Sequence, residues 1–127
     1  MNILIIDDDQ DDVAVFCEAF HEVFPHSTCY SRNDCVNIEQ VLQGLPALDV
    51  IFLDGHIFPV SSQECLPVLK KVLDPKRTKV IIHTGSVSPT EADELLALGA
   101  SAITYKASSY AKLKELLATT LADYADQ

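Results

Sequence analysis

Short runs of apolar residues alternate along the chain with longer segments whose apolar residues recur every three or four positions. Short apolar runs are typical of buried strands, and the longer spacing is typical of amphipathic helices. Three uninterrupted runs and two mixed runs predict strands at 3–6, 50–53, 80–82, 27–31 and 102–105. Helical spacing predicts helices over 13–24, 38–45, 62–73, 89–98 and 113–124.

Capping residues mark some of the helix ends. Ser88 suits an N-cap, Pro89 the first helical position and Glu91 the partner of a capping box. Ser109 or the serine before it caps the last helix. Pro67 falls within the third expected helix, where it is tolerated only in a first turn, so we expect that helix to start late or to kink.

Strands and helices alternate throughout, which predicts a parallel sheet covered by helices on both faces, with right-handed crossovers. The three wholly apolar strands belong at the centre of the sheet and the two mixed strands at its edges. The order 2-1-3-4-5 fits this requirement, and it is the order of the flavodoxin-like, doubly wound α/β fold. We therefore expect residues 1–127 to form a single (βα)5 domain.

Polar side chains follow four of the expected strands. Asp7 and Asp8 close the first strand, Asp54 the third, Thr84 the fourth and Lys106 the fifth. In a parallel sheet the carboxyl ends of the strands lie along one edge, where open α/β folds bind their ligands. The sequence thus predicts three carboxylates, a hydroxyl and an ammonium group in one crevice.

Electrostatics suggests what this crevice needs. Two carboxylates about 4 Å apart repel by about 4 kcal/mol at an effective dielectric near 20, and three such pairs cost on the order of 10 kcal/mol. That energy is comparable to the stability of a domain. A hard divalent cation such as Mg²⁺ relieves it, because Mg²⁺ prefers oxygen ligands. The cation, the ammonium and the hydroxyl together form a receptor for a phosphoryl group, and one carboxylate can act as a nucleophile.

The formal net charge of −10 weighs against nucleic-acid binding, because phosphate contacts need clustered Lys and Arg. The opening apolar run is too short for a signal peptide, and no segment reaches a membrane-spanning length. We therefore expect a soluble cytoplasmic protein. Cys17, Cys29, Cys35 and Cys65 lack metal or C-x-x-C spacing, so we expect four buried thiols in a reducing compartment.

Four stretches, taken together, resemble the receiver domain of two-component response regulators: I-L-I-I-D-D-D, I-F-L-D, V-I-I-H-T-G and G-A-S-A-I-T-Y-K. The resemblance follows their order and spacing over essentially the whole chain. It implies that Asp54 is the phospho-acceptor. It also implies that Asp7, Asp8, Asp54 and the backbone carbonyl of His56 hold Mg²⁺.

By the same resemblance, Thr84 and Lys106 bind the phosphoryl oxygens. The donor is a sensor histidine kinase or a histidine phosphotransfer protein. Phosphorylation switches a face made of the fourth helix, fifth strand and fifth helix toward an unknown protein target. The chain is then a signalling domain rather than an enzyme, limited to Mg²⁺-dependent self-phosphorylation and autodephosphorylation. We expect no output domain after the fifth helix.

Some positions depart from the family pattern. Phe58 and Ser62 stand where the family usually has Pro and Gly. Ile103 stands where it usually has a switch aromatic, with Tyr105 out of register. Ala107 replaces the usual Pro, so we expect a trans bond before it. The altered loop and Ile103 motivate an alternative hypothesis, a receiver-like interaction module that signals without phosphorylation. The intact site residues oppose it: Asp7, Asp8, Asp54, Thr84 and Lys106.

A third hypothesis is a Mg²⁺-dependent phosphatase with an aspartyl nucleophile. That class carries D-x-D-x-[TV] at the nucleophile, which D-G-H-I-F from Asp54 onward does not match. Other polar residues nearby have ordinary interpretations. Asp9, Asp11 and Asp12 could extend the metal site, but they better suit a helix start, where negative charge is stabilising. His83 is expected to pack, whereas the side chain of His56 either contacts the attacking water or is exposed.

Overall fold

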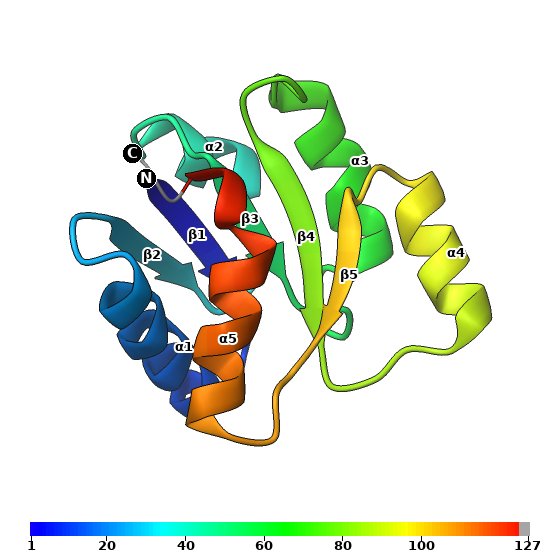
Figure 1. The fold of residues 1–127 in the computed structure, drawn as a ribbon. Coiled ribbons are helices and arrows are strands. Elements are labelled where there is room, and N and C mark those ends of the chain that lie inside the picture. The colour runs from blue at the N-terminus through cyan, green and yellow to red at the C-terminus, as the bar shows by residue number, and fades with distance from the viewer. Residues whose placement is uncertain (125–127) are drawn as a thin grey trace.

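The computed structural model describes residues 1–124 and contains one sheet of five parallel strands in the order β2-β1-β3-β4-β5 (Figure 1). The strands are β1 Asn2–Ile6, β2 Thr28–Arg32, β3 Val50–Leu53, β4 Lys79–Thr84 and β5 Ala102–Tyr105. The helices are α1 Gln10–Val23, α2 Ile38–Gln43, α3 Ser62–Val72, α4 Pro89–Ala97 and α5 Tyr110–Thr120, followed by the 3₁₀ turn η1 Ala122–Tyr124. The predicted fold class and strand order are confirmed, with small shifts at element ends.

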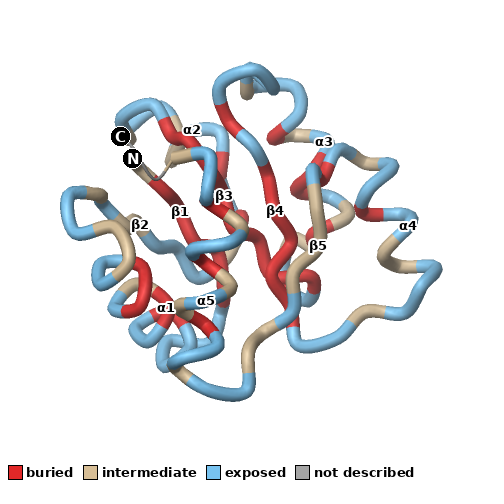
Figure 2. Tube along the Cα trace, viewed as in Figure 1, coloured by how far each residue is buried: buried red, intermediate tan, exposed pale blue. Residues whose placement is uncertain are grey.

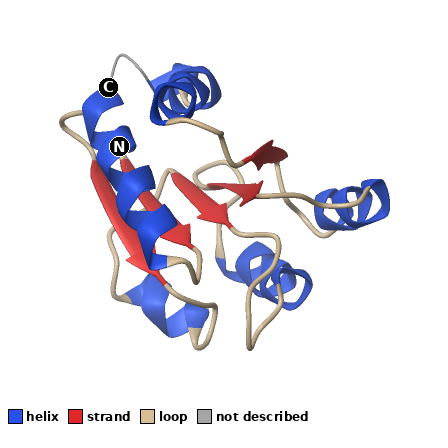
Figure 3. Ribbon diagram, turned by 90° about the horizontal axis from the view of Figure 1, so that it is seen from below, coloured by secondary structure: helices blue, strands red, loops and turns tan. Residues whose placement is uncertain are grey.

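Helices cover both faces of the sheet, as Figure 3 shows from below. Successive strand residues point to opposite faces, so β1 contributes to two cores. Ile3 and Ile5 pack with α1 and α5, and Leu4 and Ile6 pack with α2, α3 and α4. The central strands β1, β3 and β4 are buried along most of their length, whereas β2 and β5 are more exposed (Figure 2). Apolar composition therefore predicted strand position correctly.

The helix starts follow local hydrogen bonding. Ser88 caps α4, Pro89 opens the helix and Glu91 completes the capping box, as predicted. Ser109 caps α5. The late start predicted for α3 is wrong, because a second capping box fixes its first turn at Ser62 while Pro67 remains inside the helix.

The expectation of four free thiols is wrong for one pair. Cys17 of α1 and Cys29 of β2 form a disulfide, with their Cα atoms 5.7 Å apart. The fold brings α1 over β2, a proximity that cysteine spacing alone does not reveal. Cys35 and Cys65 are free and buried, as expected. A hydrogen bond between these thiols, together with burial, raises the pKa of Cys35 well above its ordinary value.

Two further observations concern the backbone and hydropathy of the described residues. The cis peptide bond is Phe58–Pro59, so the bond before Ala107 is trans, as predicted. Within residues 1–124, no helix combines the length and the apolar character needed to cross a membrane.

Candidate functional site

The acidic residues meet at the carboxyl edge of the sheet because β1 and β3 are paired neighbours. The register aligns Ile6 with Leu53, so the next residues, Asp7 and Asp54, emerge side by side. The Asp54 amide donates to the Ile6 carbonyl at 2.9 Å and extends this pairing by one residue. Asp7 and Asp54 are buried, at 2% and 7% exposure, whereas Asp8 is exposed. The site therefore combines two buried carboxylates with one that faces solvent.

The three carboxylates are close enough to share one ion. Asp7, Asp8 and Asp54 each offer an oxygen, and these oxygens lie within 4.8 Å of one another. An all-oxygen donor set suits a hard divalent cation such as Mg²⁺ or Mn²⁺. The residues present therefore fit such an ion, and the ligand role of the His56 carbonyl stays a prediction.

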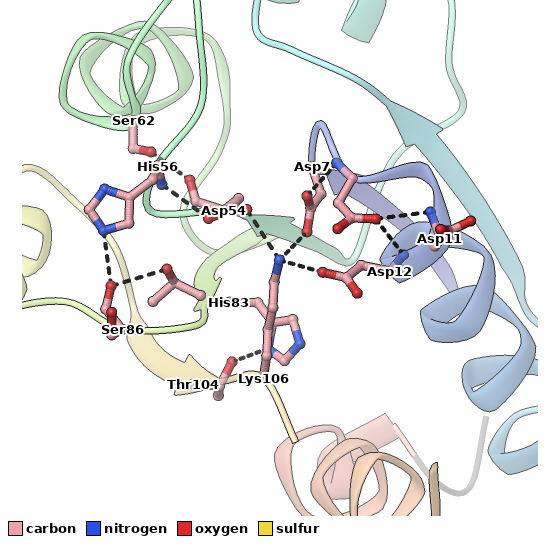
Figure 4. Close-up of polar contacts among 12 residues, drawn as sticks. Asp7, Asp11, Asp12, Asp54, His56, Ser62, His83, Ser86, Thr104 and Lys106 are labelled. Carbon is pink, nitrogen blue, oxygen red and sulfur yellow. Dashed lines mark hydrogen bonds and ion pairs between the residues drawn. The ribbon is translucent and has the colours of Figure 1, made fainter. Parts of the chain in front are cut away.

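Lys106 lies at the centre of the acidic groups (Figure 4). Its Nζ is 2.9 Å from Asp7 Oδ2, 2.8 Å from Asp12 Oδ2 and 3.4 Å from Asp54 Oδ2. Burial works against the charge of the ammonium group. The bonds to Asp12 and Asp7 and the charge on Asp54 outweigh it, so the pKa of Lys106 lies above its ordinary value. The ammonium is therefore charged and offsets part of the carboxylate repulsion.

Sequence reasoning assigned Asp12 to a helix start and missed its contact with Lys106. Asp9 caps α1 by accepting from the amides of Asp11 and Asp12, as expected for a helix start. The Asp12 side chain, however, reaches across to Lys106 at 2.8 Å. No local signal identifies this contact, because the two residues are 94 positions apart and meet only when the fold brings the start of α1 to the segment that follows β5.

The two carboxylate oxygens of Asp54 have different neighbours. Oδ1 accepts the His56 amide at 3.0 Å, and Oδ2 faces the Lys106 ammonium. Burial raises the pKa of Asp54 and the charge on Asp7 adds to this, while the His56 amide and Lys106 oppose the rise. The ionised form of Asp54 therefore depends on these two donors. Substitution of Lys106 would remove one of them, and a rearrangement of the loop after β3 would remove the other.

Thr84 lies at the same edge and is fully buried, but its hydroxyl donates to the Ser86 carbonyl at 3.5 Å. Gly55 packs directly against it, since an added Cβ would lie 3.1 Å from Thr84 Oγ1 and 3.2 Å from a methyl group of Val87. A larger residue at position 55 would displace the threonine. The structure thus brings Thr84 beside the acceptor loop, with its hydroxyl bonded within the following loop.

The two histidines near the site differ sharply. The His83 ring packs against Phe16 and Phe52, and its Nδ1 bonds to Thr104 Oγ1 at 2.9 Å. Burial, followed by the charge of Lys106, lowers the pKa of His83 to about 4. The predicted packing role is confirmed. His56, by contrast, is exposed, and its Nε2 lies 2.9 Å from the Ser86 carbonyl.

Comparison with known proteins gives no match to any family model and no match in sequence to any curated protein. Solved structures do match in fold. The signal receiver domain of a DNA-binding response regulator from Colwellia psychrerythraea 34H aligns with a TM-score of 0.81 and 20% identity, covering 100% of this chain and 99% of that one. The phosphorylated cyanobacterial phytochrome response regulator RcpA gives 0.79 and 18%, covering 94% and 90%.

The Mn²⁺-bound form of the response regulator Rcp1 aligns with a TM-score of 0.77 and 18% identity, covering 99% of this chain and 95% of that one. At such identities the similarity establishes the fold. The chain has the fold of response regulator receiver domains.

Proposed function

We propose that this chain, which has the receiver-domain fold, accepts a phosphoryl group on Asp54 in a Mg²⁺-dependent reaction and passes the change to a protein partner. One observation carries the proposal. The buried carboxylate of Asp54 lies within an acidic cluster that fits a divalent cation, and its Oδ2 is 3.4 Å from the ammonium of Lys106. A carboxylate beside positive charge supports the proposal, because phosphoryl transfer needs a nucleophile and groups that offset the negative charge of the phosphoryl oxygens.

Asp7, Asp8 and Asp54, with the backbone carbonyl of His56, would hold the Mg²⁺. When bound, the ion supplies positive charge that offsets the negative oxygens of a phosphoryl group. Asp8 is the exposed member of the set, so it faces the side from which an ion and a phosphoryl donor arrive.

In the proposed reaction an oxygen of the Asp54 carboxylate forms a bond to the phosphorus of a phosphohistidine. The phosphorus–nitrogen bond breaks, and its electron pair stays on the imidazole of the donor. Lys106 and the Thr84 hydroxyl would contact the oxygens of the resulting acyl phosphate. Hydrolysis reverses the state: water bonds to the phosphorus, the bond to the aspartyl oxygen breaks, and the carboxylate is recovered.

The proposed donor is a sensor histidine kinase or a histidine phosphotransfer protein, and the proposed target is a protein that binds the face formed by α4, β5 and α5. Leu96 and Tyr105 are 45% and 49% exposed on these elements, so apolar surface is available there. The net charge of −10 argues against nucleic acid as that target. The proposal includes a location in the cytoplasm. The Cys17–Cys29 disulfide argues against this part of the proposal, because disulfides are rare in that reducing compartment.

The alternative is a receiver-like interaction module that signals without phosphorylation. Ile103 favours it, because this side chain packs into the core cluster beside α3 and α4 rather than providing an aromatic ring that could rotate. The two hypotheses differ in a measurable way, since only the first requires a covalent change at Asp54.

The test is incubation with Mg²⁺ and acetyl phosphate, followed by intact-mass measurement. We expect the mass of one added phosphoryl group in the wild type and in the control Asp93→Asn, an exposed acid on α4. Asp54→Asn, or a chelator added to the wild type, should abolish the addition. Asp8→Asn should weaken Mg²⁺ binding by about tenfold, equivalent to about 1.4 kcal/mol. A folded wild type that binds Mg²⁺ but never gains mass would support the interaction module.

A further inference from the structure

The side chain of His56 links two loops at the carboxyl edge of the sheet. The first loop follows β3 and contains Asp54, Gly55 and His56; the second, between β4 and α4, covers residues 85–88. The His56 ring reaches from the first loop to the second (Figure 4).

The direction of this bond is fixed by chemistry. A carbonyl oxygen only accepts hydrogen bonds, so the contact of 2.9 Å to Ser86 requires a proton on Nε2 of His56. The same Nε2 lies 3.8 Å from Glu91 Oε2 in the first turn of α4. The other oxygen of Glu91 accepts from the Ser88 amide in the capping box. The His56 ring therefore approaches both the β4–α4 loop, at the Ser86 carbonyl, and the first turn of α4, at Glu91.

The Ser86 carbonyl has a second donor, the hydroxyl of Thr84 at 3.5 Å. To contact a phosphoryl group on Asp54, the hydroxyl must leave this carbonyl. Thr84 is fully buried and packed against Gly55, so its side chain has little room to turn while the loop stays where it is. Gly85 has open space at the position of a Cβ, so no packed side chain holds the loop at this residue.

We propose that His56 is a positioning residue: its ring holds the Ser86 carbonyl, and with it the β4–α4 loop, in the arrangement that keeps the Thr84 hydroxyl away from Asp54. His56 thereby opposes the switched arrangement until a phosphoryl group provides a better partner for Thr84. This inference rests on the proposed function. It adds that His56 sets how readily the β4–α4 loop rearranges when Asp54 is phosphorylated.

One hydrogen bond to a half-exposed ring changes an equilibrium by roughly two- to tenfold. Removing the His56 donor should therefore raise the population of the released loop by that factor. A ligand that selects the released loop should bind more tightly by up to the same factor, because less of its binding energy is spent on shifting the equilibrium.

The experiment compares His56→Leu, which removes the donor, with His56→Gln, whose side-chain amide can donate to the same carbonyl. ¹⁵N relaxation of the Gly85, Ser86 and Val87 amides is measured in the protein without any phosphoryl donor. We expect greater mobility of this loop in the leucine variant and near-wild-type mobility in the glutamine variant. His26→Leu, a change at an exposed histidine outside the site, is the control and should leave the loop unchanged.

A second measurement uses beryllofluoride with Mg²⁺ as the phosphoryl mimic. Its apparent affinity should be roughly two- to tenfold tighter for His56→Leu than for the wild type and His56→Gln. Equal loop mobility in the wild type and the leucine variant, or equal changes in the leucine and glutamine variants, would overturn the role of His56. Failure of every variant to bind beryllofluoride would refute the proposed function instead, and the relaxation data would still decide the role of His56.

Discussion

Lys106 and His56 flank Asp54, and the two sides of the site are held by different forces. On the Lys106 side, one ammonium contacts three carboxylates, two of them buried residues that directly follow β1 and β3 and the third in the first turn of α1. On the His56 side, one hydrogen bond to a backbone carbonyl and one carboxylate 3.8 Å away hold a ring that is 54% exposed.

Charges that are shielded from water interact strongly, so the Lys106 side is expensive to disturb. An exposed hydrogen bond exchanges with water at little cost, so the His56 side can be rearranged. A switch needs both properties: a fixed place for the chemistry and a neighbouring loop that can change position. Perturbing the Lys106 side should therefore change stability far more than perturbing the His56 side.

The largest effect should come from Lys106→Met. Asp7 and Asp54 would remain buried without their cation, and breaking a buried pair in this way costs about 4 kcal/mol. Urea unfolding at pH 8 without divalent cations measures the loss. Lys112→Met, on the exposed face of α5, is the matched control and should change the free energy of unfolding little. Equal stability of the two variants would show that Lys106 is not holding the acids.

Reduction of the Cys17–Cys29 disulfide should have the next largest effect. The bond ties α1, which carries Asp12, to β2, and closing a loop of 12 residues stabilises the folded chain by about 3 kcal/mol in the chain-entropy model. Thermal or urea unfolding with and without a thiol reductant measures this. Cys17→Ser should match the reduced wild type and should no longer respond to reductant. A wild type that is insensitive to reductant would mean that the bond does not form in solution.

The pH dependence of the free energy of unfolding should show a contribution from His83, a buried residue whose pKa is lowered by burial and by the charge of Lys106. The pKa of this histidine falls from 6.5 to about 4 on folding, so below pH 6.5 the unfolded chain binds a proton that the folded protein does not. Stability is therefore lost as pH falls from about 6.5 toward 4, by about 2 kcal/mol at pH 5. Other acids titrate in the same range, so the slope is compared with that of His83→Asn, which should lack this contribution. Parallel slopes would contradict the buried neutral ring.

The smallest effect should come from Glu91→Gln on the His56 side. The substitution keeps a side chain that can complete the capping box and removes the charge 3.8 Å from the histidine. Because both groups are exposed and screened by salt, we expect no measurable change in urea unfolding at 0.15 M salt. A large decrease in the free energy of unfolding would show that the contacts of His56 stabilise the fold as strongly as those of Lys106.

Local sequence determined the framework of the molecule. Apolar runs at 3–6, 50–53 and 80–82 predicted the central strands, and the Ser88 cap predicted the start of α4. The position of Asp7, Asp8 and Asp54 directly after strands brought them to one edge, because parallel strands all end on the same side of a sheet. These features depend on periodicity and nearest neighbours, which a sequence records directly. The roles of these residues stay predictions.

Only the tertiary structure decided which long-range partners meet. The contacts of Asp12 with Lys106, of Cys17 with Cys29 and of the His56 ring with the second loop join segments that are distant along the chain. Each depends on how closely a helix or loop packs against its neighbours and on where a side chain then points. A periodic pattern determines which face of an element is buried, but it does not determine the distances between such side chains. Those distances set how strongly the Lys106 side and the His56 side of the site are held.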